Sequence, residues 1–416
     1  MFKLSYIPVL TAVRILCTDS VKNPNREYNP FPPLKNHEFK SYKNKPKFFI
    51  MKIQHTPINL SFTDWNGKET HLQNTANCYI IRNEGTYQIP LVYGNAIKDG
   101  KVNTEAFYTK GIATEFEDSY GIPFTASSSP FIRDHAAAQD KFVASAEILW
   151  NDGESKINIL SVDNDFLTFD VQSFSLCNAL VAVKDNDGTI LWSWHLWLTN
   201  EDLTPKTITN AEGIDFKVMP CNLGWNGWTA DGKPTSPYYQ WGRKDPFIAN
   251  GSVTYKAISN TQKQYIAHQN PKDFYYCNRS YSWTTDKYKY FWDSKMNGHS
   301  VDQKVTKTIY DPCPTGWCIP QFNTFMGISN YNATVADKGH YCTTKEGKQD
   351  LFIPFAGHRS SISGSVCNIG HNGYCWLSPS FNKDLGCLFF QGGNGFNPYY
   401  YNYRSSGHSV RPVLSN

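Results

Sequence analysis

The sequence has no uninterrupted apolar run of about 18 residues, so no transmembrane segment is expected. It also lacks long segments rich in Ala, Leu, Glu and Lys, and only 18% of its 416 residues are charged, which argues against a helical bundle. Gly, Pro, Asn and Ser are frequent instead, and aromatic residues make up 15% of the chain. This composition is typical of a turn-rich, mainly β protein, and of an extracellular one.

Catalytic signatures are missing as well. There is no phosphate loop and no dinucleotide-binding fingerprint. The stretch SISGSV contains Ser363 and Ser365, but it does not have the spacing of a nucleophile elbow. Acidic residues are scattered, so no glycosidase pair is visible. The triplet Trp150-Asn151-Asp152 matches a calcium-lectin motif only by coincidence, because it falls in a predicted hairpin turn. We therefore expect no enzyme, no metal and no other cofactor.

Positive charge is concentrated at the N-terminus. The whole chain carries +4, and residues 1–50 alone have nine Lys/Arg against three Asp/Glu, about +6, which leaves about −2 for the remainder. Because the remainder is not basic, we expect no nucleic-acid partner. The start MFKLSYIPVLTAVRILC suggests a secretory signal or a lipid-modified Cys17, but Arg14 interrupts its apolar stretch. We expect residues 1–54 to be a disordered arm or the product of a wrongly assigned start.

Strand patterns dominate residues 55–205. The segments SAEILW and KINILSV flank Asn151-Asp152-Gly153, and NALVAVKD and TILWSWHLWLT flank Asn186-Asp187-Gly188. Each pattern predicts a hairpin with a favoured turn. The last strand has one wholly apolar face and one half-apolar face, as in a β-sandwich. His195 in this strand could be a ligand or an acid-base group, but a hydrogen-bonded structural histidine is the favoured interpretation.

The composition of the chain changes after a polar linker at residues 201–213, and eight of the eleven cysteines lie between 221 and 387. The segment YDPCPTGWCIP (310–320) allows three interpretations: a metal knuckle, a redox pair or a rigid corner. Cys313 and Cys318 are separated by four residues, which suits neither two close pairs of zinc ligands nor a Cys-x-x-Cys motif. We favour a corner that is stiffened by prolines, turns at Gly316 and is anchored by Trp317.

Six short motifs follow one another in this half of the chain. They are VMPCNLGW (218–225), YYQWGRKDPF (238–247), KTIYDPCPTGWCIP (307–320), FIPFAGHRSSISGSV (352–366), GYCWLSPS (373–380) and RSSGHSVRPV (404–413). Their order resembles the Fibrobacter succinogenes major paralogous domain of Bacteroidetes surface proteins. TANCYII (75–81) and residues 178–199 resemble the β-domain of fimbrillin-like and proposed pilus-tip proteins. The resemblance implies a mainly β protein with a β-sandwich at 55–205 and an α+β, C-type-lectin-like domain at 214–416.

The resemblance also implies a cell-surface adhesin or binding protein, extracellular or on the outer membrane. Its partner would be a host or microbial glycan or protein, and as a pilus-tip subunit it would join pilus stalk subunits by strand addition. We expect Trp225, Trp241 and Trp376 to fill the core. Two Gly/Asn-rich loops carry further aromatic residues that suit contact with a ligand. The candidate ligand-binding residues are Trp228, Asn397, Tyr399, Tyr400 and Tyr401.

Two alternatives stay open. A secreted enzyme with a lectin-like fold would use reactive cysteines, and a structural surface component would bind no ligand. In an exported protein Cys313, Cys318, Cys367 and Cys375 are possible disulfide cysteines. Buried free thiols would give the same sequence pattern.

Overall fold

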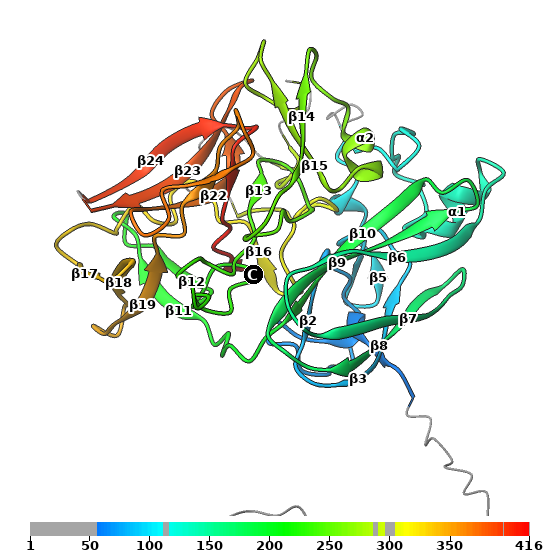
Figure 1. Cartoon of the computed structure of the whole chain (residues 1–416), viewed down its shortest axis with the longest axis horizontal. Helices are drawn as coiled ribbons and strands as arrows, with labels where there is room; N and C mark the ends of the chain where they lie inside the picture. Colours follow the sequence, from blue (N-terminus) through cyan, green and yellow to red (C-terminus); the bar gives the residue numbers. More distant parts are fainter. Residues whose placement is uncertain (1–55, 111–115, 286–289, 296–303, 394, 416) are drawn as a thin grey trace, which may run out of the picture. The chain divides into compact units, whose positions relative to one another are not determined.

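The computed structural model describes residues 56–110, 116–285, 290–295, 304–393 and 395–415, which belong to one compact unit, Gln54–Asn416. The candidate signal, Cys17 and the expected disordered arm lie outside the described residues. The structure is mainly β, with 42% strand and 5% helix, which confirms the expected class. The elements form several small sheets that are linked by long irregular segments (Figure 1).

The first part of the chain forms two four-stranded sheets (Figure 1). One has the order β1 (Ile58–Asn59), β3 (Gly85–Pro90), β8 (Phe166–Ser173) and β7 (Lys156–Val162). The other has the order β2 (Cys78–Ile81), β10 (Ile190–Leu198), β9 (Cys177–Asp185) and β6 (Val143–Asn151). The second sheet supplies most of the core here, because eight of the nine residues of β10 are buried. A short hairpin is formed by β4 (Ile97–Lys98) and β5 (Lys101–Val102). Two short 3₁₀ helices lie at Leu60–Phe62, after β1, and at Thr104–Ala106, after β5.

One of the two expected hairpins is confirmed and the other is wrong. Strands β9 and β10 pair across the turn at residues 186–188. Strands β6 and β7, by contrast, belong to different sheets, since β6 pairs with β9 and β7 with β8. Side-chain bonds turn the chain between the sheets: Asp152 Oδ1 accepts the Asn178 N–H at 2.6 Å, and Asn151 Nδ2 donates to the Ser155 carbonyl at 2.9 Å. The chain therefore passes from one sheet to the other at this point.

The second part of the chain forms smaller sheets. One four-stranded sheet has the order β11 (Lys206–Thr209), β12 (Asp215–Val218), β26 (Val413–Leu414) and β16 (Trp317–Cys318). A second four-stranded sheet has the order β13 (Tyr239–Gln240), β25 (Gly407–His408), β20 (His358–Arg359) and β21 (Val366–Cys367). Two three-stranded sheets are β17 (Ala333–Ala336), β18 (Gly339–Thr343), β19 (Gln349–Pro354) and β22 (Asn372–Ser380), β23 (Leu385–Gly392), β24 (Gly395–Tyr403). A parallel pair is β14 (Thr254–Ile258) and β15 (Asp273–Cys277), and the helices are α1 (Ile132–Ala137) and α2 (Gln264–Gln269). Strand β11 lies in the segment that we expected to be a linker.

The residues on both sides of that segment share one large hydrophobic core, which runs in sequence from Leu60 to Val410. Asn77 connects them further, because its Nδ2 atom donates to the carbonyl oxygens of Ile309 (2.6 Å) and Asp311 (2.8 Å). Gly94 permits this approach, since a Cβ atom there would lie 2.2 Å from the Ile309 oxygen. The proposed division of the chain at residues 206–213 stays a prediction.

The segment 310–320 is a rigid corner inside this core. The two carboxylate oxygens of Asp311 accept the backbone N–H groups of Cys313 (2.8 Å) and Ile319 (2.9 Å). Gly316 turns the chain with φ +78°, and the fully buried Trp317 donates its indole N–H to the Trp65 carbonyl at 2.7 Å. The prolines and the bonds of Asp311 thus fix the backbone from both ends.

Candidate functional site

Several exposed aromatic side chains lie on β24, at the edge of its sheet. Tyr399, Tyr400, Tyr401 and Tyr403 are 55%, 40%, 47% and 36% exposed. Two rings from neighbouring loops lie against them, Phe381 (46% exposed) and Tyr281 (41% exposed). We call these six residues the aromatic surface.

Five of the six rings of the aromatic surface stack in two separate groups, while Tyr399 contacts the Phe322 ring. Phe381 and Tyr401 have ring centroids 4.5 Å apart at an interplanar angle of 13°, and Tyr281 and Tyr403 are 4.5 Å apart at 17°. Tyr400 lies nearly parallel to Tyr401, with centroids 6.1 Å apart. Each stacked partner restricts the rotamers of its neighbour, so a ligand would meet rings whose orientation is already set.

The exposed edge of β24 is poorly suited to pairing with another strand. Pro398 has no backbone N–H, and the N–H groups of Tyr399 and Tyr403 donate to the side-chain oxygens of Asn397 (3.0 Å) and Asn402 (2.7 Å). These features remove donors that strand addition would need. Asn397 is exposed, as expected for a ligand-binding residue, but its Oδ1 atom is occupied by this local bond.

Trp228 is half-buried. Its ring makes an edge contact with Trp225 at 5.3 Å, and the Lys338 ammonium lies 5.2 Å from its ring centroid. None of the ring contacts found within the described ranges joins it to the tyrosines of β24. The structure thus brings together three of the five expected ligand-binding residues as stacked or exposed rings, with Asn397 beside them. Trp225, Trp241 and Trp376 are buried, which confirms that part of the prediction.

The four cysteines considered as disulfide partners, Cys313, Cys318, Cys367 and Cys375, carry free thiols in the structure. Burial raises the pKa of the Cys375 thiol to about 11 and that of Cys313 well above its ordinary value. A thiol with a raised pKa is a weak nucleophile at neutral pH because little thiolate is present. Cys367 is only partly buried. Within the described part of the chain, no cluster of three or more His, Cys, Asp or Glu side chains could hold a metal ion.

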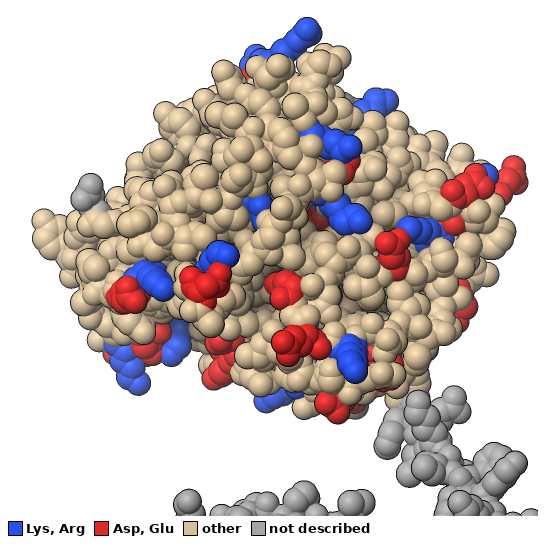
Figure 2. Space-filling model, in the orientation of Figure 1, with Lys and Arg blue, Asp and Glu red and all other residues tan. Residues whose placement is uncertain are grey.

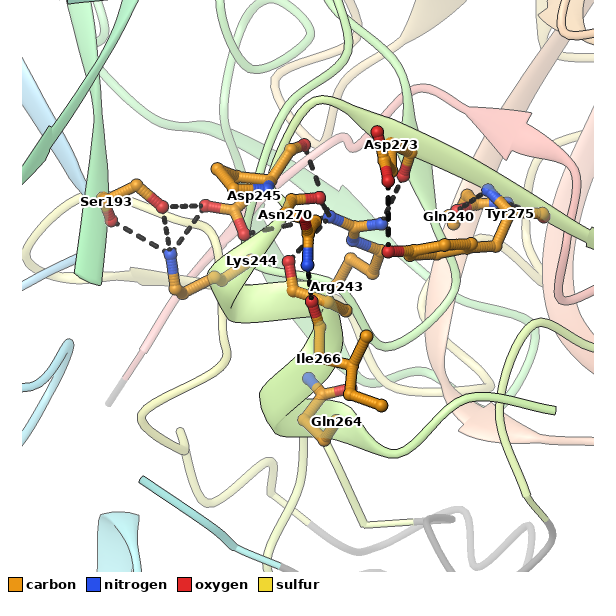
Figure 3. Close-up of polar contacts among 12 residues, drawn as sticks. Ser193, Gln240, Arg243, Lys244, Asp245, Gln264, Ile266, Asn270, Asp273 and Tyr275 are labelled. Atoms are coloured by element: carbon orange, nitrogen blue, oxygen red, sulfur yellow. Dashed lines mark hydrogen bonds and ion pairs between the residues drawn. The ribbon is translucent and has the colours of Figure 1, made fainter. Parts of the chain in front are cut away.

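The motif QWGRKDPF places two cations and a carboxylate in the core, a feature that our sequence interpretation missed. The Lys244 ammonium donates to Asp245 Oδ1 (2.5 Å), to Ser193 Oγ (2.7 Å) and to the Ser193 carbonyl (3.0 Å) (Figure 3). Ser193 Oγ in turn donates to Asp245 Oδ1 at 2.6 Å. Arg243 is turned toward the end of α2, where it donates to the carbonyls of Ala267 (3.2 Å) and Asp273 (2.7 Å).

This buried cluster has the composition of a nucleophile with a general base. Desolvation lowers the pKa of Lys244 to about 8, although the charge of Asp245 opposes the shift. However, Ser193, Lys244 and Asp245 are each 1% exposed, and none of them lines a cavity described below. A substrate has no access to a nucleophile in this position, so the cluster acts as a bond between β10 and the second part of the chain.

Three other buried arginines serve the irregular segments in the same manner as Arg243. Arg359, Arg404 and Arg411 each donate to backbone carbonyl oxygens of distant segments. All three belong to the motifs on which the family resemblance depends. Loops have few internal backbone bonds, so a guanidinium with five donors can satisfy several of their carbonyls at once.

Two cavities open near this scaffold. The first, of about 380 Å³, is lined by Lys233, Ala249, Asn250, Gly251, Ser252, Val253, Arg359, Ser363, Gly364, Ser365, Val366 and Ile369. The second, of about 490 Å³, lies between β12, β26 and Lys345. On the face shown in Figure 2, Lys, Arg, Asp and Glu are scattered in small mixed groups, with no broad area of one sign.

No helix within the described ranges has the length and apolar character that a membrane crossing requires. The comparisons with known proteins give no identification: no family model matches the chain, and neither a curated protein nor a solved structure is significantly similar to it.

Proposed function

We propose that this protein is a non-enzymatic cell-surface binding protein that recognises a glycan or a protein through the aromatic surface of β24. The observation that carries the proposal is the exposure of four tyrosines along one nine-residue strand without a charged residue. Removing such rings from water on binding desolvates no charge, and their stacking leaves little rotamer entropy to lose. Sugar rings and extended peptides both suit a surface of this kind.

In this proposal the two four-stranded sheets at the beginning of the described chain form a fimbrillin-like β-sandwich. The segments after residue 214 form a C-type-lectin-like head, and the protein lies outside the cell or on the outer membrane. Attachment to a pilus stalk would then use an edge of the first two sheets, because the edge of β24 has lost N–H donors to Pro398, Asn397 and Asn402.

The test is a binding screen of the intact chain on a glycan array and on immobilised host matrix proteins. A binder found in the screen is measured again with the double substitution Tyr401→Ala and Tyr403→Ala. Removing two stacked anchors is expected to weaken binding at least about 30-fold, since the loss of even one hot-spot aromatic costs roughly 2 kcal/mol. Tyr331→Ala is the matched control, because Tyr331 is fully exposed and lies outside the aromatic surface.

Unchanged affinity in the double variant would refute the assignment of the aromatic surface. A complete absence of binders in both screens would favour the structural surface component. Rapid modification of several native thiols by a maleimide, together with loss of a catalytic turnover, would favour the enzyme instead.

A further inference from the structure

The first cavity, which we call the cationic hollow, is a preformed site that lies outside the aromatic surface. Two segments form its two main walls, 249–253 and 363–366, and Lys233, Arg359 and Ile369 complete its lining. None of its lining residues belongs to β24. Its volume of about 380 Å³ is at the lower end of the range for small-molecule sites, and it suits a ligand of the size of a monosaccharide.

Arg359 fixes the two walls relative to each other. Its Nη2 atom donates to the Gly251 carbonyl at 2.8 Å and also to Ile248, and its Nη1 atom donates to the Gly364 carbonyl at 2.6 Å. The side chain is 1% exposed, so these bonds are protected from water. A site whose walls are already tied together loses little conformational entropy when a ligand enters.

The charge of the hollow is positive. Its only titratable lining residues are Lys233 and Arg359, and among the described residues Arg359 makes no ion pair with a carboxylate. Desolvation lowers the pKa of Arg359 to about 10, as expected for a cation without an anionic partner. Lys233 lies at the rim, with its ammonium 2.7 Å from Asp231 and its side chain 51% exposed. An anion beside Lys233 would therefore also be attracted by the buried charge of Arg359, which has no carboxylate partner of its own among the described residues.

The remaining lining residues are a mixture of polar and aliphatic side chains. Asn250 Oδ1 is buried and has no hydrogen-bond partner in the described part of the chain, while the Nδ2 atom of the same residue donates to Pro234. Three exposed serines and three aliphatic side chains also face the site. They are Ser252, Ser363, Ser365, Val253, Val366 and Ile369.

From this combination we propose that the cationic hollow binds a carboxylate-bearing monosaccharide. The carboxylate would pair with the Lys233 ammonium at the rim, attracted also by the buried charge of Arg359, and ring hydroxyls would bond to the exposed serines. The aliphatic side chains would contact the ring's C–H groups. Binding at this site does not depend on the function proposed for the aromatic surface.

The experiment is a calorimetric titration of the full chain at low salt with glucuronate, glucose and inorganic phosphate. We expect glucuronate to bind with a dissociation constant of roughly 1 mM, the order that its few non-hydrogen atoms allow, and glucose to bind at least tenfold more weakly. Lys233→Glu should weaken glucuronate binding about fivefold, because it reverses a rim charge. Ser363→Asp, which adds a carboxylate at an exposed position, should abolish binding while the protein stays folded.

Lys345→Glu is the matched control, since Lys345 is also an exposed lysine paired with an aspartate but lies in the second cavity. It should leave the affinity for glucuronate unchanged. Equal affinity for glucose and glucuronate would refute the role of the positive charge. Equal affinity for phosphate and glucuronate would refute the assignment of the site to a sugar. Absence of heat with all three probes at concentrations well above 1 mM would overturn the site itself.

Discussion

Replacing His195 should remove a defined part of the acid sensitivity of this protein. His195 is 1% exposed in β10, and its two ring nitrogens have partners that suit the neutral form. Nε2 lies 2.9 Å from Asn178 Oδ1, and Nδ1 lies 3.3 Å from the Tyr239 hydroxyl. Asn178 uses its Nδ2 atom as a donor to three oxygens, so its Oδ1 is the acceptor. His195 therefore carries its proton on Nε2, and a second proton would leave a positive charge in the core.

The magnitude follows from the difference between the folded and unfolded states. Burial lowers the pKa of His195 from 6.5 to about 3, so below pH 6.5 the unfolded chain binds a proton that the folded chain does not. The contribution of neutral His195 to the free energy of unfolding is therefore fully present above pH 6.5. It is lost by about 1.4 kcal/mol per pH unit as the pH falls toward 3. At pH 4.5 the loss from this one residue is about 2.7 kcal/mol.

The assay is urea unfolding of the wild-type chain and of His195→Gln at pH 7.0 and pH 4.5. The variant starts from lower stability at pH 7, but its loss between the two pH values should be smaller than that of the wild type by about 2.7 kcal/mol. Asp152, whose pKa burial raises to about 6, contributes a slope of opposite sign, but it does so in both chains and cancels in the difference.

Tyr239→Phe is the control, because it removes a hydrogen-bond partner but keeps His195. It should destabilise the fold by about 1–3 kcal/mol at both pH values and leave the loss between them unchanged. If His195→Gln and the wild type lose the same stability on acidification, the reasoning from burial is refuted.

Three further predictions follow from the scaffold. Gly242→Ala should lower the free energy of unfolding in urea by about 2–4 kcal/mol, because Gly242 has φ +88° and a Cβ atom there would lie 2.3 Å from the Phe291 ring. Equal urea midpoints for this variant and the wild type would contradict the close packing of Gly242 on Phe291. Arg243→Lys should cost about 3–5 kcal/mol in the same assay, since an ammonium cannot reach the carbonyls that the guanidinium bonds, and a change below about 1 kcal/mol would contradict their importance. In a Cys17→Ser chain, a thiol reagent should modify Cys367 first and the buried thiols only on unfolding; failure of unfolded Cys313 and Cys318 to react would show that they form disulfides.

Local patterns were sufficient where the neighbours in sequence are also the neighbours in space. The turn at Asn186-Asp187-Gly188 gives the predicted hairpin because its backbone conformation suits the twist of the flanking strands. The corner at 310–320 followed from prolines and Gly316, whose constraints are local. Tyr399, Tyr400 and Tyr401 were expected to suit contact with a ligand, and the rings of all three are exposed on β24, an edge strand of its sheet.

Patterns failed where distant side chains decide the structure. The turn at Asn151-Asp152-Gly153 has a favourable hairpin sequence, but Asp152 bonds Asn178 and directs the chain to the other sheet. Likewise, Lys244 and Asp245 have the charge of surface residues, and only the tertiary contact with Ser193 explains their burial. The cationic hollow could not be predicted at all, because its two walls are more than a hundred residues apart in the sequence. The identity of the ligand-binding residues on β24 stays a prediction.

The bonds from buried guanidinium groups to main-chain oxygens have an evolutionary consequence. Arg359 holds Ile248, Gly251 and Gly364 through their carbonyls, which every amino acid possesses. Side chains in these loops are thus free to diversify, provided that the arginine and the turn-forming glycines remain. New recognition properties can arise by drift at the loop tips of an unaltered framework, in the manner in which antibodies vary their hypervariable segments.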